Sequence, residues 1–208
     1  MNKIDCLLTQ FPPYSEDLGI DLTKPNGRLK WFLASILFGA RISEKIASNT
    51  YKAFQEAGID SPDKVLSAGW TRLVKILDSG GYVRYDFSTA SKLLLIMEKM
   101  KERYGSLENL YLESSNTKDL ENRLMDFKGI GPITVKIFLR ELRGIWDITP
   151  EVSSKMKTIA DCLGIDLSNF KGERLSRIET ALVKLDIRYC KKKRCFSCPM
   201  SHFCIMFQ

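Results

Sequence analysis

The chain has 208 residues, of which 44% are hydrophobic, so it can bury a sizeable core in one domain or two small ones. Lys and Arg outnumber Asp and Glu by 32 to 25, and the net charge of +7 favours an anionic partner such as nucleic acid. The composition excludes a disordered chain, and no apolar run reaches the ~18 residues of a membrane span or forms the core of a secretory signal. We therefore expect a protein of the cytoplasm or nucleoid that has no contact with a membrane.

The predicted elements are all helices. Apolar residues recur at helical spacing from Asn26 to Ala57 and are interrupted at Phe38–Ala40, which predicts two helices with a short joint, the second capped by Ser43. Helix-start residues and glycine stops then predict helices over about 61–68, 71–78, 88–103, 107–112, 116–125, from 132 onward, 156–164 and 175–185. No segment alternates at period two for long enough to form a sheet, so the sequence predicts an all-α fold without internal repeats.

A glycine-containing segment, Phe127–Thr134, separates two of these helices and reads FKGIGPIT. Gly129 and Gly131 allow a tight turn and a close approach of the backbone to a ligand, while Ile130 can fill the core between the helices. The free N–H groups and the positive dipole end of the following helix suit a phosphate oxygen, and Pro132 fits the first helical position. The pattern thus predicts a phosphate-binding hairpin, with a purely structural turn as the alternative.

Four cysteines near the C-terminus are spaced C-x4-C-x2-C-x5-C; they are Cys190, Cys195, Cys198 and Cys204. In a reducing compartment such closely spaced cysteines are better interpreted as metal ligands than as disulfides. The first gap holds only basic residues, namely Lys191, Lys192, Lys193 and Arg194. The pattern predicts a metal-centred loop pressed against a polyanion, whereas Cys6 and Cys162 stand apart and are expected to be small buried side chains.

With these motifs the chain resembles the helix-hairpin-helix base-excision DNA glycosylases of the endonuclease III and adenine-glycosylase type. The resemblance covers about residues 28–204 and includes the early helix pair around Ile36–Ala40, the hairpin and the terminal cysteines. It implies a two-lobed fold, in which residues 28–143 form a helical domain with the hairpin, and residues 1–27 and 144–208 form a second lobe with the cysteine loop. It also implies a monomeric DNA repair enzyme that flips and excises a damaged or mispaired base from duplex DNA.

The same resemblance implies a cofactor. In the family the four cysteines hold a [4Fe-4S] cluster, and the last three cysteines of this chain have the family spacing. The first gap has four residues, whereas the family usually has six. Zinc bound by the four cysteines, or with the help of His202, is the alternative.

The family places a catalytic Asp some twenty residues after the second hairpin glycine, and two registers compete for that position. Counting forward from Gly131 gives Glu151, whereas aligning backward from the predicted helix 156–164 gives Ser153; Asp147 is a weaker candidate. A carboxylate there could stabilise positive charge on the sugar or help to activate the nucleophile. The alternative is that Asp147 and Glu151 are solvated residues near a helix start.

Bifunctional members of the family also carry a Schiff-base Lys just after the hairpin, and this chain has Ile133 there, which implies a mainly monofunctional enzyme. Arg41 follows Ala40, which occupies the register of the family's Gln wedge, and Arg84 lies in a loop that interleaves aromatic and basic residues. The predicted DNA contacts are Lys128, Gly129, Ile130, Gly131, Thr134, Lys136, Arg41, Arg84, Lys191, Lys192, Lys193 and Arg194.

Two other functions remain open at this point. One is a DNA-binding paralogue that has lost excision and recognises distorted duplex through the same frame. The other is an RNA-binding or structural zinc protein, for which the hairpin and the cysteine loop would be coincidental. The segment 147–153 separates the enzyme from the binder, because only the enzyme needs a carboxylate there.

Overall fold

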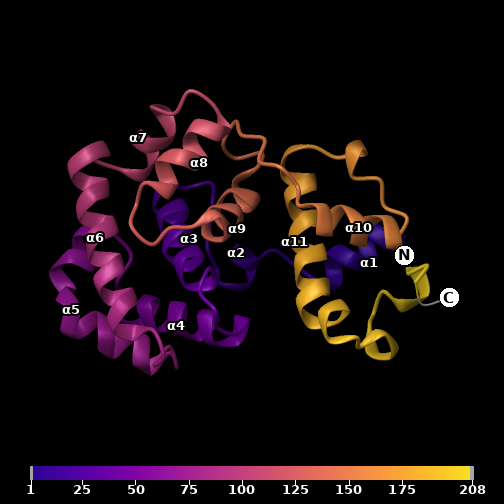
Figure 1. Cartoon of the computed structure of the whole chain (residues 1–208), viewed down its shortest axis with the longest axis horizontal. Coiled ribbons are helices and arrows are strands. Elements are labelled where there is room, and N and C mark those ends of the chain that lie inside the picture. The colour runs from indigo at the N-terminus through magenta and orange to yellow at the C-terminus, as the bar shows by residue number, and fades with distance from the viewer. Residues whose placement is uncertain (1, 207–208) are drawn as a thin grey trace. The chain divides into compact units, whose positions relative to one another are not determined.

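The computed structural model describes residues 2–206, and over these residues it forms helices and no strand, apart from one isolated bridge between Arg143 and Trp146. The predicted all-α class is confirmed (Figure 1). The chain divides into two compact units. The central unit is Leu18–Phe138, and the terminal unit combines the residues up to Asp17 with those from Leu139 onward.

The central unit contains six complete helices and the first part of a seventh. They are α3 (Pro25–Phe38), α4 (Glu44–Glu56), α5 (Pro62–Ser79), α6 (Asp86–Tyr104), α7 (Leu107–Leu112), α8 (Thr117–Met125) and α9 (Pro132–Leu142), which continues beyond the unit boundary. As predicted, Ser43 caps α4, its hydroxyl accepting the Ile46 N–H at 3.2 Å. The two predicted helices 61–68 and 71–78 are the two halves of α5, and the break is at Gly69 with φ 68° and ψ 171°.

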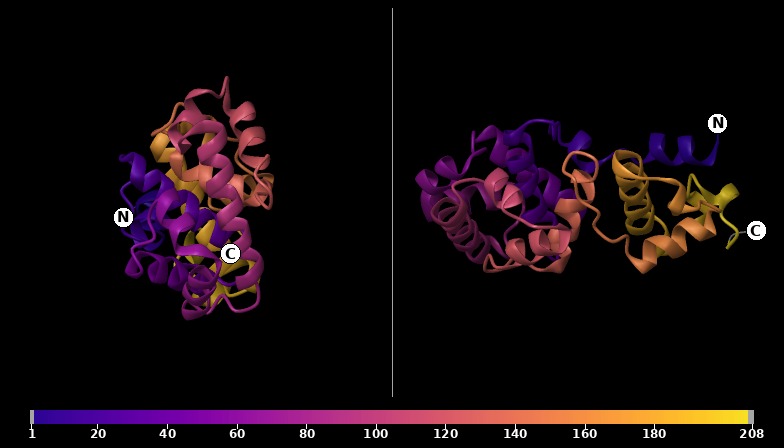
Figure 2. Two further views of the ribbon diagram at one scale, coloured as in Figure 1. Left: turned by 90° about the vertical axis from the view of Figure 1, so that its left-hand side faces the viewer. Right: turned by 90° about the horizontal axis from the view of Figure 1, so that it is seen from above.

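Aromatic side chains fill the core of the central unit around α3. Trp31 is fully buried, and its indole N–H donates to the backbone oxygen of Phe138 at 3.0 Å. The rings of Phe32 and Phe138 pack edge to face with centroids 5.1 Å apart. The α5 and α6 helices run side by side (Figure 2). The α9 helix, which follows the hairpin, is thus anchored to this core through Phe138.

The terminal unit is built from both ends of the chain. It contains α1 (Lys3–Gln10), α2 (Tyr14–Asp17), α10 (Ser154–Cys162) and α11 (Gly172–Arg188), together with the 3-10 turns Leu167–Asn169, Cys190–Lys192, Cys195–Ser197 and Ser201–Phe203. No helix is predicted before residue 26, yet Asn2 caps α1 by accepting the N–H groups of Ile4 and Asp5. Its core brings Leu7 of α1 together with Ile178 and Leu182 of α11.

The unit boundaries lie at 17/18 and 138/139 instead of the predicted 28 and 143. Polar contacts hold residues 22–23 on the central unit and residue 141 on the terminal unit. Arg28 donates to the backbone oxygens of Leu22 and Thr23, at 3.0 and 2.8 Å, which holds residues 22–23 on the central unit. In the terminal unit, Glu141 accepts the backbone N–H groups of Tyr14 and Ser15 at 3.0 and 2.9 Å. Neither set of contacts leaves a signal in the local sequence pattern.

A buried lysine joins α2 to α11 inside the terminal unit. The Lys184 side chain is fully buried, and its ammonium bonds the carboxylate of Asp17 at 2.6 Å and the backbone oxygen of Pro12. It also lies 4.3 Å from the ring centroid of Tyr14. Burial lowers the pKa of Lys184, and the bond to Asp17 opposes this shift.

Candidate functional site

The hairpin positions its exposed and buried residues on opposite sides. Phe127 and Ile130 are buried, and the Ile130 N–H donates to the oxygen of Phe127 at 2.9 Å, which closes the turn. Lys128 and Gly129 are exposed on the rim. Gly129 has a φ of 88°, and a methyl group there would stand 2.5 Å from Cδ of Lys92. The rim therefore depends on glycine both for its backbone conformation and for space.

The first turn of α9 completes the hairpin. The Gly131 oxygen accepts the Val135 N–H at 3.1 Å, so Pro132 is the first helical residue. The N–H groups of Ile133 and Thr134 belong to the first turn, which has no partner for them within the helix. This geometry can bind a phosphate oxygen, and Lys136 is exposed one turn further along.

The joint after α3 lies against this first turn. A side chain at Gly39 would overlap the hydroxyl of Thr134, so the Gly39 backbone packs directly against the Thr134 side chain. Arg41 is exposed just beyond the joint, and Arg84 is exposed with its guanidinium 5.5 Å from the ring centroid of Tyr85. A cavity of about 390 Å³ lies beside them, lined by Gly39, Ala40, Arg41, Tyr82, Tyr85, Ser88, Thr89 and Lys92.

The three candidates for the catalytic position all precede α10. Ser153 is the N-cap, and its hydroxyl accepts the Met156 N–H at 3.4 Å. Glu151 has an 85% exposed side chain, and Lys157 lies 3.5 Å from its carboxylate. Asp147 is also exposed. Arg143 holds the backbone next to Glu151 in place. Its buried side chain pairs with Glu179 at 2.7 Å and donates to the backbone oxygen of Pro150 at 2.6 Å.

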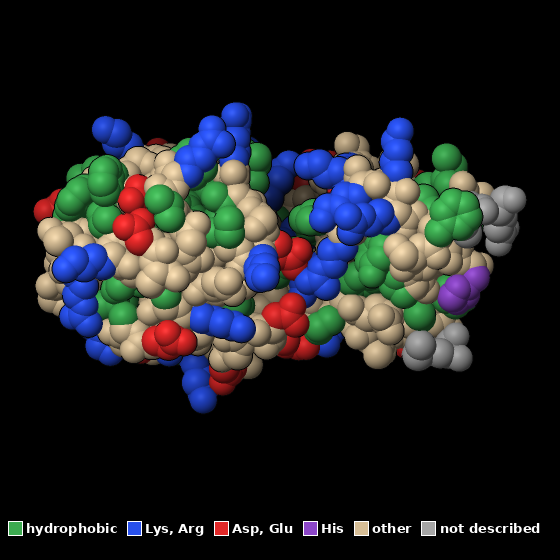
Figure 3. Space-filling model, turned by 90° about the horizontal axis from the view of Figure 1, so that it is seen from below, with side chains coloured by type: hydrophobic (Ala, Val, Ile, Leu, Met, Phe, Trp, Pro, Cys, Tyr) green, Lys and Arg blue, Asp and Glu red, His purple; other side chains and the backbone are tan. Residues whose placement is uncertain are grey.

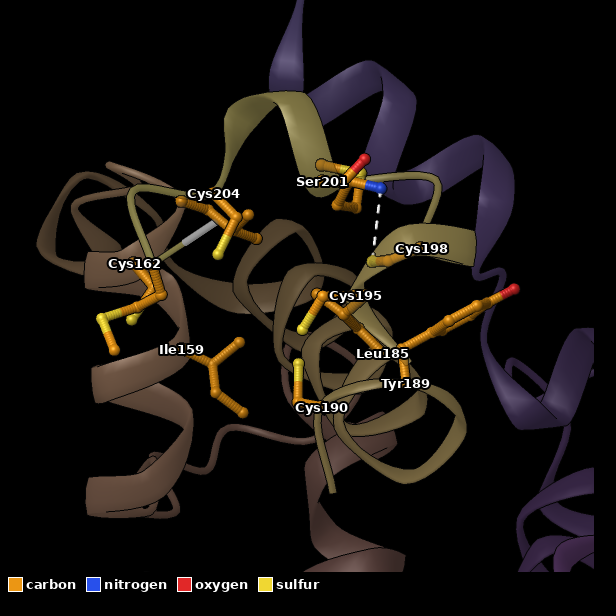
Figure 4. A pocket seen from close by; sticks show the side chains of 12 residues that line it. Ile159, Cys162, Leu185, Tyr189, Cys190, Cys195, Cys198, Ser201 and Cys204 are labelled. Atoms are coloured by element: carbon orange, nitrogen blue, oxygen red, sulfur yellow. Dashed lines mark hydrogen bonds between the residues drawn. The ribbon is translucent and has the colours of Figure 1, made fainter. Parts of the chain in front are cut away.

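The four predicted cysteine ligands line one cavity of about 190 Å³ in the terminal unit (Figure 4). Figure 4 shows the sulfur atoms of Cys190 and Cys195 facing one another. The cavity wall is otherwise largely apolar and includes Ile159, Leu185 and Met200. All four thiols are free of disulfides. The four thiols line one apolar cavity, and thiolates are the protein ligands of iron-sulfur clusters.

Burial and mutual proximity raise the pKa of two of these thiols, Cys190 and Cys198. Partial burial of its sulfur, reinforced by the neighbouring thiols and Asp186, raises the pKa of Cys190 to about 11, although the residue as a whole is exposed. Burial likewise raises the pKa of Cys198, although the Met200 N–H donates to its sulfur at 3.4 Å and opposes the shift. Over residues 2–206, no three His, Cys, Asp or Glu side chains are placed to hold one metal ion. A cluster of four irons has a different requirement, because each thiolate binds a separate iron.

The four basic residues of the loop lie on the surface. Lys191, Lys192, Lys193 and Arg194 are all exposed, and Tyr189 accepts the backbone N–H groups of Lys192 and Arg194 at 3.1 and 3.0 Å. Phe196, next to this run, is 95% exposed. Figure 3 shows Lys and Arg side chains spread widely over one face of the molecule, in keeping with the net charge of +7. Such a surface attracts a polyanion in a salt-sensitive manner.

Comparison with known proteins identifies the architecture. No family model matches the sequence, and no curated protein is similar to it. The structure is similar to the crystal structure of the H. pylori 3-methyladenine DNA glycosylase MagIII bound to 1,N6-ethenoadenine. The TM-score is 0.56 at 15% identity, over 90% of this chain and 98% of that one. The chain has the fold of a DNA glycosylase.

The two compact units divide the predicted site residues into two groups. The central unit holds the hairpin, Arg41 and Arg84, whereas the terminal unit holds the cysteine loop and the segment 147–153. The similarity concerns the fold and does not test the iron-sulfur, endonuclease III-like assignment. The cluster therefore remains a prediction. Among the described residues, no helix is long and apolar enough to cross a membrane.

Two residues on these cavities were missed by sequence analysis. Lys92 lines the cavity beside the hairpin, and Cys162 lines the cysteine cavity, where its oxygen accepts the Ile205 N–H at 2.9 Å. Both occupy ordinary positions on predicted helices. Only the three-dimensional packing brings them to a site.

Proposed function

We propose that the protein is a DNA glycosylase that removes a damaged or mispaired base from duplex DNA. The hairpin carries this proposal: its rim is exposed at Lys128 and Gly129, and the first turn of α9 offers N–H groups to a phosphate, in a chain with a glycosylase fold. The exposed basic run of the cysteine loop supplies a second contact to the DNA backbone.

The proposed reaction is hydrolysis of the N-glycosidic bond. A water oxygen bonds to C1′ of the sugar as the bond to the base breaks, and the base leaves with the electron pair and takes up a proton. Ile133 replaces the Schiff-base Lys of bifunctional relatives, and its side chain is 68% exposed, so the enzyme would act mainly without lyase chemistry at that position. Glu151 is the proposed carboxylate, which would orient the water or stabilise positive charge on the sugar, with Asp147 as the second candidate.

We further propose that Cys190, Cys195, Cys198 and Cys204 hold a [4Fe-4S] cluster. The shared cavity of about 190 Å³ supports this assignment. When bound, the cluster would supply a four-point cross-link for the loop that presents Lys191–Arg194. Zinc, the alternative from the sequence, would need four sulfurs around one ion, and the described side chains are not placed in that way.

One alternative function is favoured by a specific observation. The Ser153 hydroxyl is engaged in capping α10, and Glu151 is solvent-exposed beside Lys157, as expected for a surface residue. A protein without a working carboxylate would bind distorted DNA and leave the base in place. The enzyme and the binder therefore differ only in excision.

The decisive experiment is alkaline strand scission of duplexes that carry single lesions. The panel begins with 3-methyladenine and 1,N6-ethenoadenine, because the similar H. pylori enzyme is named for the first and holds the second. We expect cleavage at one lesion at least, and a loss of about 10²–10⁴-fold in Glu151→Gln with DNA affinity retained. Tight binding without cleavage at any lesion would establish the binder instead.

The cofactor has its own measurement. Protein isolated without oxygen should be brown and contain about four irons per chain if the four cysteines each bind one iron of the cluster. Stoichiometric zinc in that preparation would contradict the iron-sulfur assignment and leave the excision test unaffected.

A further inference from the structure

The cavity beside the hairpin belongs entirely to the central unit and contains no residue assigned to catalysis. Three segments form it: the joint after α3, the loop before α6 and the first two turns of α6. Its volume of about 390 Å³ lies in the usual range of small-ligand sites. It adjoins the phosphate-binding geometry directly, because Gly39 lies against Thr134 and the Lys92 stem lies against Gly129.

Lys92 brings a positive charge that no protein group compensates. The side chain is half-buried, and burial alone lowers its pKa, with no charged neighbour among the described residues contributing. Arg41 is a second cation on the cavity wall, and the wall includes no carboxylate. A partly buried ammonium without a carboxylate partner is costly unless an anion arrives from outside.

Tyr82 closes part of the cavity wall. The residue is 1% exposed, and its buried hydroxyl interacts with the side chain of Thr89, which lies on the same wall. The contacts that the cavity offers to an anion therefore come from its two cations, Lys92 and Arg41.

We propose that this cavity is a second phosphate subsite, in which Lys92 and Arg41 bind a phosphate of the DNA strand held by the hairpin. The inference rests on the proposed DNA-binding function and adds a specific contact to it. The cavity lies next to the hairpin, since Lys92 contacts Gly129 and Gly39 contacts Thr134. The two sites would therefore bind separate phosphates of the same DNA strand.

The test is equilibrium binding of a duplex oligonucleotide across a salt series. Lys92→Met keeps the apolar stem and removes the charge, so affinity should fall about tenfold and the slope of log K against log salt should shrink by about one. Lys101→Met is the matched control, because Lys101 lies on the same helix, is exposed and pairs with Asp63, and it should change neither quantity. An unchanged affinity and slope in a folded Lys92→Met protein would overturn the proposal.

Two further arms identify the ligand. Millimolar inorganic phosphate should compete weakly with the duplex in the wild type and not in Lys92→Met. Competition as effective as that of DNA would show a site for free phosphate instead. Borohydride trapping of an abasic duplex should give no adduct at Lys92, because an adduct would make this amine a nucleophile and contradict the phosphate role. Base excision is measured separately, so its absence would contradict the proposed enzyme and leave the Lys92 result intact.

Discussion

The Lys184 side chain contributes to stability in two ways, through the packing of its aliphatic stem and through the polar contacts of its ammonium group. The stem is buried against the core of the terminal unit, while the ammonium joins Asp17 and the oxygen of Pro12. Asp17 keeps 42% of its side chain exposed, so water can solvate it if the lysine is lost. Packing should therefore outweigh the ion pair in the free energy of unfolding.

We expect Lys184→Ala to lower the free energy of unfolding by about 2–4 kcal/mol, because it leaves a cavity in a packed core. Lys184→Met fills most of that space and should cost about 1 kcal/mol or less. Urea unfolding of both variants measures the difference. Equal losses in the two would show that the charge, and not the stem, dominates.

The pKa of Lys184 also makes stability depend on pH. Burial lowers the pKa in the folded state, so between that pKa and the ordinary value of 10.5 the unfolded chain binds more protons than the folded one. Folding of the wild type should therefore become more favourable relative to Lys184→Met as pH rises toward 10.5. Unfolding free energies at several alkaline pH values provide the check, and a difference that narrows with rising pH would refute the assignment.

At the scale of elements, helix starts and breaks were predictable and contacts between elements were not. Ser43, Ser61 and Asn116 cap their helices as short-range chemistry requires, and Gly69 interrupts α5 where its sequence indicated a stop. Lys92 gives no such signal, because it is one of several lysines on a long helix and gains meaning only beside Gly129. The choice between Glu151 and Ser153 for the catalytic position has the same difficulty. It depends on how the segment packs, and residue spacing alone does not predict that packing.

The two hairpin glycines should respond differently to alanine. Gly131 has open space at its Cβ position and no unusual φ, so Gly131→Ala should preserve stability and weaken DNA binding about tenfold, or ~1.4 kcal/mol, if the backbone approaches a phosphate. Gly129→Ala introduces strain at a φ of 88° and a clash with Lys92, and should also lower stability by about 1–3 kcal/mol. Thermal unfolding and binding to a duplex separate the two effects. Full DNA affinity in Gly131→Ala would contradict close approach at this residue.

At the scale of the whole molecule, the glycosylase fold joins two units with separate cores and separate candidate sites. The all-α class followed from helical periodicity, whereas the unit boundaries did not, because they depend on side chains such as Arg28 and Glu141 that reach distant backbone. Similarity at 15% identity establishes the architecture only. The reaction has to be inferred from the individual site residues.

This separation predicts a local response to loss of the proposed cluster. Removal of iron should raise hydrogen exchange over residues 189–206 and at the end of α10, because Ile205 bonds the oxygen of Cys162. Residues 18–138 should keep their protection. Uniform loss of protection in both units would show that the cluster stabilises the chain as a whole.

The order of segments along the chain also dictates an order of assembly. The α1 helix packs with α11, although the whole central unit is translated between them. A growing chain can complete the central unit on the ribosome while its first helix still lacks a partner. The cysteine cavity is completed last, so any cofactor would be inserted into a protein whose hairpin, the proposed DNA contact, is already folded.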